Sequence, residues 1–310
     1  MAKKIDEVII IGCGIAGIAA ARQLKKHKVP FRVISEDIGG RICTSKKGDI
    51  NYGAYFVLTD YNYVLPLVDI KEKLHPFQLE FHSKNKGSYF LQSIMRHPLE
   101  LAKMIILIQK FRYEYATFKK QSLKQSQKDL ISSNPYFAEL YNSTAEEFAR
   151  KKGIVNISQK FLSEGVYMCS FLPLSKVSAF DYLRLSQGLF VDSFEFVFRF
   201  DKALKGIKRY IIKDSIKSIR QTKEICLTTK KGKKYYAKRL IMATNPTVAN
   251  KLLGLKYTKK PSIAHVFHLK GKLKSEWEGG QFELFGPQSK TIFIRKERDN
   301  SFIFYTKLAS

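Results

Sequence analysis

The chain has 310 residues, 45% hydrophobic and 13% aromatic, which is long enough for two domains with a buried core and excludes a disordered or fibrous protein. Its four cysteines are scattered without a CxxC pair, so they indicate neither a zinc site nor a dithiol centre and predict reduced thiols in a cytoplasmic protein. The net charge of +28 comes mostly from dispersed lysines without a nucleic-acid-binding module, so no nucleic-acid partner is expected. A lysine-rich composition alone and attraction to an anionic membrane surface are the two alternatives left.

Neither a signal peptide nor a membrane span is predicted. Residues 1–5 are short and basic and run directly into the first strand, without the apolar segment of a secretory signal. The longest apolar candidate, residues 104–108, is far shorter than the roughly 20 apolar residues that a spanning helix needs. We therefore expect a cytoplasmic protein, with peripheral membrane contact as the alternative.

The first 35 residues predict a βαβ unit. Residues 7–11 are a continuous apolar run that is typical of a buried parallel strand, and a glycine-rich turn ends it. Residues 15–26 are rich in alanine and leucine with basic residues late, which favours a helix. Residues 31–35 then predict a second strand.

The turn between the first strand and the helix carries a GxGxxG motif at Gly12, Gly14 and Gly17, in the strand-to-helix context of a dinucleotide-binding site. The first glycine permits the turn, the second lets a pyrophosphate approach the backbone, and the third lets the helix pack against the strand. The amides of the first helical residues, Ile15 and Ala16, are expected to face the phosphates. Glu36, 24 positions after Gly12, is the expected acidic partner of the ribose; at this point FAD and NAD fit equally well.

The middle region, residues 61–188, is predicted to be a helical insertion with helices at 99–120, 144–152 and 157–168. Thr144 and Glu147 form a capping box. Residues 99–128 combine apolar and basic residues in an amphipathic pattern that suits either an anionic membrane surface or ordinary packing against the rest of the domain, with apolar positions at Met104, Ile105, Ile108 and Phe111.

The second half of the chain returns to strands. Short strands at 210–212, 215–221, 224–230 and 234–237 predict an antiparallel meander. A buried strand at 239–243 and a helix at 247–253 follow it. From residue 262 onward, alternating segments predict a second sheet.

Two further motifs follow the dinucleotide turn: the run Gly39-Gly40-Arg41-Ile42 and the segment Asn51-Tyr52-Gly53-Ala54. Together with the turn they resemble the flavin amine oxidase and phytoene desaturase superfamily. The likeness covers residues 5–55 best and 140–255 less closely. It implies FAD as the cofactor, held in an α/β fold in which a Rossmann-like FAD-binding domain with a parallel sheet and a β-meander is combined with an interleaved α+β substrate domain.

The resemblance also assigns roles to residues. It implies a FAD-binding domain at 1–60 and 200–256 and a substrate domain at 61–199 and 257–310. Arg41 would lie near the phosphates, to which its planar guanidinium is suited. Further cofactor contacts are implied for Gly39, Gly40, Gly53, Ala54, Ile216, Ala243 and Thr244.

Three departures from the superfamily pattern qualify these expectations. The loop after Glu36 is short, so Ser35 or Glu36 is the ribose partner. Asn51 stands where the superfamily commonly has Asp. The usual last FAD segment, a Gly-Asp strand followed by a glycine-rich helix start, is not found before Ser310, so we expect a truncated or decayed relative.

The resemblance implies that an amine or an isoprenoid-like lipid is oxidised by hydride transfer to the flavin, so that the cofactor carries the chemistry. No catalytic triad or metal cluster is visible in the sequence. His265 stands near the position of a lysine beside the flavin in some amine oxidases; His268 and Lys270 fit almost as well, and an ordinary strand residue is the alternative. The competing function is a non-catalytic nucleotide-binding or interaction protein. An NAD-dependent dehydrogenase is disfavoured because the Gly39-Gly40-Arg41 run has no role there.

Overall fold

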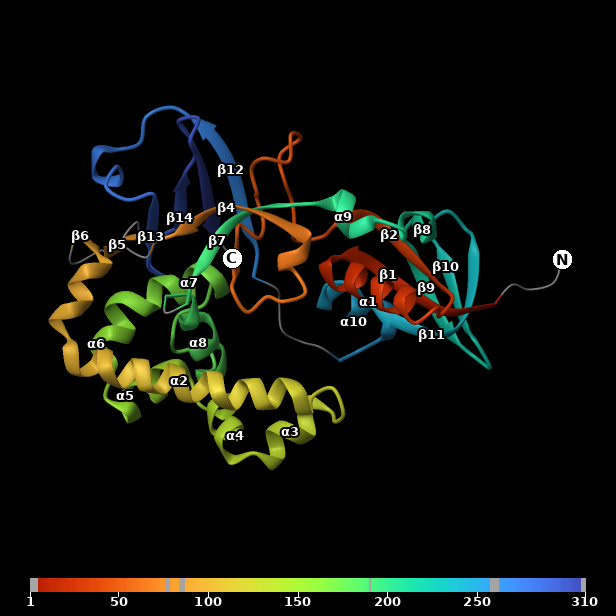
Figure 1. The fold of residues 1–310 in the computed structure, drawn as a ribbon, viewed down its shortest axis with the longest axis horizontal. Coiled ribbons are helices and arrows are strands. Elements are labelled where there is room, and N and C mark those ends of the chain that lie inside the picture. Colours follow the sequence, from red (N-terminus) through yellow and green to blue (C-terminus); the bar gives the residue numbers. More distant parts are fainter. Residues whose placement is uncertain (1–4, 76–78, 84–86, 190, 257–261, 308–310) are drawn as a thin grey trace. The chain divides into compact units, whose positions relative to one another are not determined.

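The computed structural model describes residues 5–75, 79–83, 87–189, 191–256 and 262–307; the basic residues 1–4 lie outside this range. The chain forms two compact units, each built from two separate segments (Figure 1). The first unit contains Met1–Glu72 and Phe194–Pro261, and the second contains Lys73–Ser193 and Ser262–Ser310. Helices and strands alternate in both, so the prediction of a mixed α/β fold is confirmed.

The first unit is organised around a six-stranded sheet in the order β8-β2-β1-β11-β10-β9. Strand β1 is parallel to both β2 and β11, and β2 is parallel to β8. Strands β11, β10 and β9 form an antiparallel meander as predicted, but the strand expected at 210–212 does not belong to it: β8 pairs in parallel with β2 at the opposite edge of the sheet. The strands are β1 (Ile5–Gly14), β2 (Phe31–Gly39), β8 (Ile211–Lys213), β9 (Ile216–Gln221), β10 (Ile225–Thr229) and β11 (Lys234–Met242).

The apolar run of β1 is buried on both faces, as expected for a central parallel strand. Val8 and Ile10 pack into one hydrophobic cluster, whereas Ile9 and Ile11 pack into another on the opposite face. Three helices accompany the sheet: α1 (Ile15–Lys26), α9 (Phe200–Leu204) and α10 (Pro246–Leu253), with short 3-10 turns η1 (Leu65–Leu67) and η6 (Lys208–Tyr210). The predicted βαβ unit is confirmed.

A separate three-stranded sheet has the order β3-β7-β4, with β3 at Phe56–Leu58, β7 at Ser193–Phe198 and β4 at Val68–Leu74. It pairs segments from both halves of the sequence.

The bounds of the strands and helices correct two sequence predictions. The strands predicted at 234–237 and 239–243 are one continuous strand, β11, which runs without a turn from Lys234 to Met242. The predicted helical insertion at 61–188 begins with strands, and its first long helix starts only at Pro98.

The second unit contains a six-stranded sheet in the order β12-β15-β14-β13-β5-β6. Strands β5 and β13 are parallel neighbours, and the other pairs are antiparallel. Their bounds are β5 (Leu79–Ser83), β6 (Gly87–Phe90), β12 (Ala264–Lys270), β13 (Phe282–Phe285), β14 (Thr291–Lys296) and β15 (Ser301–Lys307). The second sheet predicted from residue 262 onward is therefore present, with two strands added from the middle of the chain.

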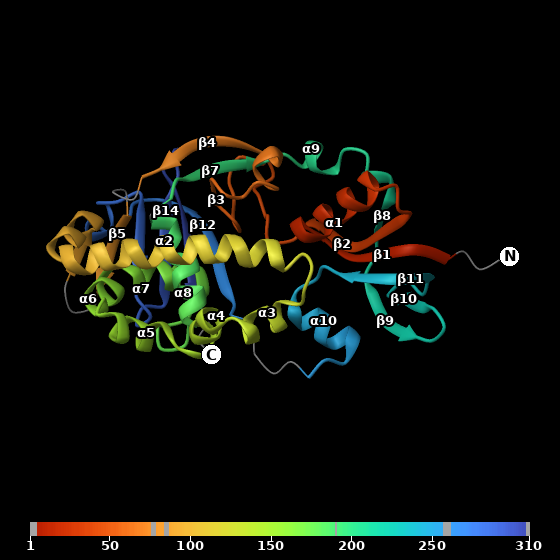
Figure 2. The same ribbon diagram turned by 60° about the horizontal axis from the view of Figure 1, so that its bottom comes forward.

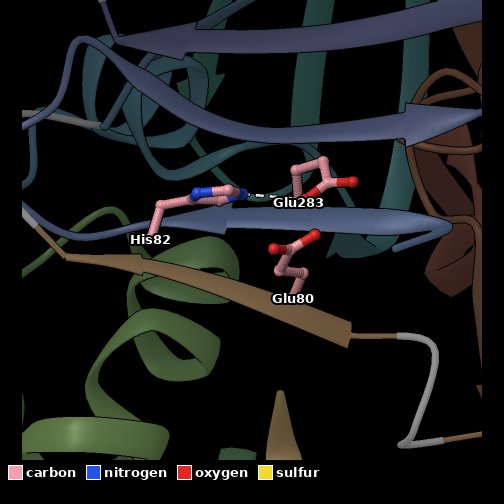
Figure 3. A group of neighbouring side chains, drawn as sticks. All are labelled: Glu80, His82 and Glu283. Carbon is pink, nitrogen blue, oxygen red and sulfur yellow. Dashed lines mark hydrogen bonds and ion pairs between the residues drawn. The ribbon is translucent and has the colours of Figure 1, made fainter. Parts of the chain in front are cut away.

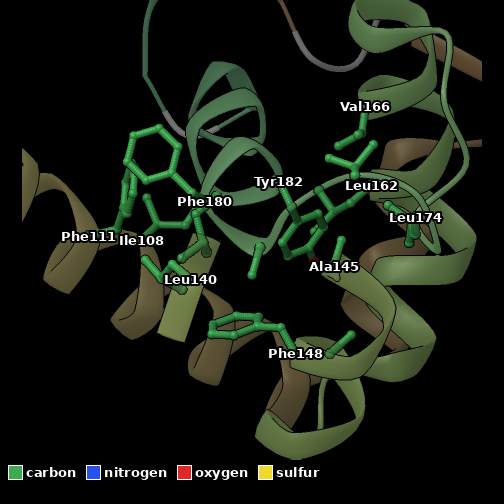
Figure 4. Close-up of a cluster of buried hydrophobic side chains, with 14 of the residues drawn as sticks. Ile108, Phe111, Leu140, Ala145, Phe148, Leu162, Val166, Leu174, Phe180 and Tyr182 are labelled. Carbon is green, nitrogen blue, oxygen red and sulfur yellow. The ribbon is translucent and has the colours of Figure 1, made fainter. Parts of the chain in front are cut away.

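The helices of the second unit pack around a large aromatic and aliphatic core, and the long α2 runs beside the shorter ones (Figure 2). They are α2 (Pro98–Gln121), α3 (Gln127–Ser133), α4 (Pro135–Asn142), α5 (Ala145–Lys152), α6 (Val155–Ile157), α7 (Ser163–Ser170) and α8 (Ala179–Ser186), with 3-10 turns η3 (Leu91–Arg96), η5 (Gln187–Leu189) and η7 (Ser275–Trp277). Figure 4 shows side chains of α2, α4, α5, α7 and α8 meeting in this core. The helix predicted at 157–168 is interrupted by one π-helical turn, η4 (Ser158–Leu162).

Local sequence signals place several helix ends correctly. The Thr144 hydroxyl accepts from the amide of Glu147, and the Glu147 carboxylate accepts from the amide of Thr144, so the predicted capping box at the start of α5 is confirmed. Asn245 caps α10 in a similar way, by accepting from the amide of Val248 at 2.9 Å. Both caps satisfy amides that the helix itself leaves without partners.

Candidate dinucleotide-binding site

The carboxyl ends of β1, β2, β8 and β11 lie at one edge of the first unit's sheet, because these four strands are mutually parallel. β1 lies between β2 and β11 in the sheet. The chain passes from β1 through α1 to β2 on one side, whereas β11 flanks β1 on the other side, so the strand order reverses at β1. Ligands of open α/β sheets bind outside the carboxyl ends at such a switch point. The predicted cofactor residues of β1, β2 and β11 all stand at this edge.

The turn from β1 into α1 needs glycine at two positions. Gly12 has a φ of +101°, and a Cβ there would lie 2.6 Å from the carbonyl oxygen of Ala243. A Cβ on Gly17 would lie 2.0 Å from the carbonyl oxygen of Gly12. Only glycine therefore lets α1 pack this closely against the turn and against the end of β11.

The amino terminus of α1 is open to an anion. Gly14 is the N-cap residue and supplies no side-chain hydrogen bond, and the first turn contains no acidic residue. The amides of the first turn, including those of Ile15 and Ala16, thus lack intrahelical partners, and the helix dipole adds partial positive charge there. Ile15 is half-buried and Ala16 is exposed. These are the features of a phosphate-binding helix terminus.

The Gly39-Gly40-Arg41 run lies directly against this turn. Gly39 pairs with Gly14 at the end of the β1–β2 ladder, and a Cβ on Gly40 would lie 3.1 Å from the Cα of Gly14. Arg41 is exposed, and its guanidinium makes no hydrogen bond or ion pair with any residue in the described part of the chain. A residue that carries an exposed cation, unpaired among the described residues, thus follows the glycine that contacts the anion-binding turn.

Residues 41–54 fold back on themselves as a hairpin. The amide of Ala54 donates to the carbonyl of Arg41 at 3.1 Å, and the amide of Tyr52 donates to the carbonyl of Cys43 at 2.7 Å. The backbone of Gly53 lies against Arg41, since a Cβ on Gly53 would be 1.9 Å from the Arg41 carbonyl oxygen. Ala54 itself is exposed. The hairpin therefore holds the backbone of Arg41 in place while leaving its side chain exposed.

Asn51, the residue that departs from the superfamily pattern, has a structural contact. It is buried, and its side-chain amide donates to the carbonyl of Phe196 in β7 at 2.6 Å. This contact joins the hairpin to a segment 145 residues later. An amide suits the position because it donates to a carbonyl, which an ionised carboxylate does not.

The two candidate ribose partners differ in what they contact. The Ser35 hydroxyl accepts from the amide of Cys13 at 3.0 Å and donates to the carbonyl of Asp37 at 2.6 Å, so it is occupied within the protein. Glu36 is exposed, and its carboxylate lies 3.7 Å from the ammonium group of Lys230. Residues 35–37 bulge out of the β1–β2 ladder, and Glu36 lies within this bulge.

Asp214 is an acidic residue of this edge that the sequence interpretation did not single out. It is buried after β8, and its amide donates to the carbonyl of Ser35 at 3.1 Å. Burial by itself raises the pKa of its carboxyl group, but hydrogen bonds from the Thr229 hydroxyl and the Ser215 amide outweigh this and lower the pKa below its ordinary value. Its neighbours along the chain are polar and charged, and no local pattern marks it as buried.

The remaining predicted residues are divided between the two units. In the first unit, Ala243 follows β11, and its amide donates to the carbonyl of Ile11. The next residue, Thr244, is half-buried, and Ile216 is the first residue of β9. His265 belongs to the second unit, where it lies exposed on the edge strand β12. His268, on the same strand, is hydrogen-bonded to the Ser301 hydroxyl at 2.7 Å.

Cys13 lies inside the dinucleotide turn but has no reactive character. The thiol is buried, and burial raises its pKa to about 11. A thiol with such a pKa is almost entirely protonated at neutral pH and is a poor nucleophile. The described residues of this edge therefore offer binding groups, and the turn contains no activated nucleophile.

Comparison with known proteins agrees with this geometry. Residues 10–70 match the model of the NAD(P)-binding Rossmann-like domain. No curated protein matches the chain by sequence. None of the helices in the described part of the chain has the length and apolar character required to span a membrane.

Solved structures resemble the chain over nearly its whole length. A putrescine oxidase variant with redesigned cofactor binding superposes with a TM-score of 0.68 at 13% identity, covering 97% of this chain and 75% of that protein. For cyclohexylamine oxidase from Brevibacterium oxydans IH-35A the TM-score is 0.66 at 16% identity, covering 98% and 76%. For an oxidoreductase from Methanosarcina mazei it is 0.63 at 12% identity, covering 98% and 79%. The predicted resemblance to the flavin amine oxidase superfamily is thus confirmed at the level of the fold.

Proposed function

We propose that the protein is a FAD-dependent oxidoreductase of the amine oxidase and desaturase type. The observation that carries the proposal is the direct contact between Gly14 in the dinucleotide turn and Gly40 in the adjacent turn, which is followed by the exposed Arg41, a cation without an ion pair among the described residues. The Rossmann turn alone suits either NAD or FAD. The second glycine turn and its arginine favour FAD, because they resemble the motif that wraps the pyrophosphate in the flavin superfamily.

The residues present fit an anionic dinucleotide. The uncapped amides of α1 and the Arg41 guanidinium would hold the pyrophosphate, and the exposed Glu36 carboxylate would accept hydrogen bonds from the adenosine ribose. FAD, when bound, supplies a two-electron acceptor for hydride from a carbon atom of the substrate. The protein's part is to hold the substrate in place and to exclude water.

The substrate class is an amine or an isoprenoid-like lipid. Two of the structurally similar proteins are by name oxidases of amines, putrescine and cyclohexylamine. Pocket shape sets substrate choice within one fold, so these named amines serve as the starting compounds for a substrate search. A first substrate panel would therefore contain diamines, cyclic amines and an isoprenoid hydrocarbon.

Cofactor binding is tested by titrating the purified full-length protein with FAD and with NAD and following flavin absorbance and fluorescence. We expect saturable FAD binding that is tighter than NAD binding. Arg41→Ala should raise the Kd for FAD roughly tenfold or more, because a charge-assisted hydrogen bond contributes about 1.5–3 kcal/mol. Lys46→Ala removes an exposed charge from the same hairpin and is the matched control. An equal loss of FAD affinity in Arg41→Ala and Lys46→Ala would contradict the proposal. The absence of FAD binding by the folded wild type would contradict it as well.

The alternative is a non-catalytic nucleotide-binding protein. Anaerobic mixing of the FAD-loaded protein with the substrate panel separates the two functions, because only an oxidoreductase loses flavin absorbance on mixing. FAD binding without reduction by any member of the panel favours the alternative. If reduction is found, His265→Ala tests the candidate histidine, and an unchanged reduction rate removes it from consideration.

We also propose peripheral contact between α2 and an anionic membrane. Met104, Ile108 and Phe111, three of the apolar positions considered in the sequence, are buried in the core of the second unit and are not accessible to lipid. A different stripe is exposed, with residues seven apart and lysines between them: Leu99, Lys103, Ile106, Lys110 and Tyr113. Apolar side chains among lysines are the pattern of helices that bind anionic surfaces.

Vesicle flotation tests this contact. Binding to phosphatidylserine-containing vesicles and not to pure phosphatidylcholine vesicles is expected. Ile106→Glu should weaken binding, whereas Leu123→Glu, which changes an exposed leucine after the end of α2, should not. Flotation that is independent of anionic lipid would count against the proposal.

A further inference from the structure

A second polar cluster lies on the sheet of the second unit. Glu80 and His82 are two residues apart on β5, so both side chains are on the same face of the sheet. The register of the parallel pair places Glu283 of β13 beside Glu80, and Phe285 beside His82. Figure 3 shows the three polar side chains turned toward one another. One histidine nitrogen and one oxygen from each glutamate all lie within 4.8 Å of one another.

The two glutamates are buried but differ in how they are satisfied. Glu283 is fully buried; its Oε1 accepts from the amide of Gly280 at 2.9 Å and pairs with the Lys296 ammonium at 3.0 Å, while its Oε2 lies 2.8 Å from Nε2 of His82. Burial raises the pKa of Glu283, but the hydrogen bonds from His82 and Lys296 outweigh it, so that the pKa is lowered. Glu80 is only 4% exposed, and its Oε2 has no hydrogen-bond partner among the described residues.

The Oε2 atom of Glu80 needs an explanation, because buried polar atoms nearly always have a hydrogen-bond partner. The Lys296 ammonium pairs with Glu283, whereas the Glu80 carboxylate has no cationic partner among the described residues. A divalent cation would satisfy both the charge and the unpaired oxygen. The donor set, one imidazole nitrogen and two carboxylate oxygens, suits Zn²⁺ and neighbouring first-row metals better than Mg²⁺ or Ca²⁺, which prefer oxygen alone.

Neighbouring residues restrain the positions of these side chains. The His82 ring stacks on Phe285 with centroids 4.7 Å apart, which restrains its orientation. The backbone of Gly279 lies over Glu80, since a Cβ there would be 2.2 Å from Oε2. Residues that surround metal ligands orient them and raise the affinity for the metal. The His82 side chain keeps 13% exposure, which gives an ion access from solvent.

We propose that Glu80, His82 and Glu283 form a binding site for one divalent first-row transition-metal ion. Glu283 binds through Oε2, since its Oε1 stays with Gly280 and Lys296. Donors about 2.1 Å from a common metal lie roughly 3 to 4 Å apart, so the present 2.8 Å contact between His82 and Glu283 opens slightly when the ion enters. The site belongs to the second unit and does not depend on the dinucleotide-binding edge.

The test is calorimetric titration of tag-free, chelator-treated full-length protein with Zn²⁺. One saturable site per chain is expected. Glu80→Gln and His82→Gln should each weaken it by at least roughly tenfold. His265→Gln, which removes an exposed histidine from the same sheet, should leave the affinity unchanged and so controls for adventitious surface binding.

Co²⁺ provides a second readout, because coordination in a protein site that includes His82 should intensify and shift the visible d–d absorption relative to aqueous Co²⁺, a change that His82→Gln should lose. Circular dichroism establishes that each variant is folded. If Glu80→Gln does not fold, the partly exposed His82→Gln decides the question alone. The absence of a saturable Zn²⁺ site in the wild type, or wild-type affinity in folded His82→Gln, would overturn the proposal.

Discussion

The Cα of Gly14 lies 3.1 Å from the position that a Cβ would occupy on Gly40, so two turns separated by 26 residues meet backbone to backbone at the start of α1. The contact brings the open amides of the helix next to Arg41. It joins the GxGxxG turn to the Gly39-Gly40-Arg41 run, which resembles a motif of the flavin amine oxidase superfamily. The glycines of this region divide into those that the fold requires and those that a ligand would require.

Gly14→Ala and Gly17→Ala should separate these two requirements. A Cβ on Gly14 would lie 3.7 Å from Gly40, an ordinary contact, and the extended backbone of Gly14 accepts alanine. We expect Gly14→Ala to fold normally and to weaken FAD binding roughly tenfold or more, about 1.4 kcal/mol, because the methyl group obstructs the pyrophosphate.

Gly17→Ala, in contrast, places its Cβ 2.0 Å from the Gly12 carbonyl oxygen and should cost about 3 kcal/mol of stability or more. Urea unfolding and FAD titration of both variants check the pair. A destabilised Gly14→Ala with unaltered FAD affinity would show that the second glycine serves packing alone.

Asn51→Asp should destabilise the first unit even though aspartate is common at this position in the superfamily. The Asn51 amide donates to the Phe196 carbonyl at 2.6 Å in a buried setting, and an ionised carboxylate would face that carbonyl with no proton to donate. We expect a loss of about 1–3 kcal/mol at neutral pH, measured by urea unfolding. Asn51→Asp with wild-type stability would mean that the contact contributes nothing.

Glu100 should make the second unit sensitive to acid. Its carboxylate accepts from the Asn156 side chain at 2.7 Å and from the Ile157 amide at 2.9 Å. Burial raises its pKa, but these hydrogen bonds prevail and lower it below the ordinary 4.5. A lowered carboxyl pKa contributes stability above the unfolded-state value, and the contribution disappears as the pH falls through the folded-state value.

Glu100→Gln should therefore lose about 1 kcal/mol at pH 7 and little at pH values below the folded-state pKa. Thermal denaturation of both proteins from pH 7 to pH 3 measures the difference. If the difference in stability between the wild type and Glu100→Gln stays constant from pH 7 to pH 3, the ionised form of Glu100 is not its source.

Cysteine reactivity should distinguish the dinucleotide turn from the hairpin beside it. Cys13 is buried with its pKa raised to about 11, whereas Cys43 is exposed. Iodoacetamide at pH 8 should alkylate Cys43 in the native protein and leave Cys13 unmodified until denaturant is added. Peptide mass spectrometry measures both sites in one sample, and rapid native labelling of Cys13 would contradict the buried position.

The sequence by itself determined the local features of this protein. The βαβ unit, the glycine turn, the capping box of Thr144 and Glu147, and the meander follow from signals within a few residues, because strand burial, turn geometry and helix capping are short-range effects. The superfamily resemblance rested on such local motifs, and the fold agrees with it. The cofactor roles of the glycines, Arg41 and Glu36 remain predictions.

Only the tertiary structure decided which distant residues meet. The contact of Asn51 with Phe196 spans 145 residues, and that of His82 with Glu283 spans 201. The register of neighbouring strands sets such contacts, and no local pattern encodes it, so the sequence interpretation noticed neither Asp214 nor the Glu80 cluster. The exposed face of α2 was decided in the same way: both of its sides carry apolar residues, and packing in the core selected Met104, Ile108 and Phe111 for burial.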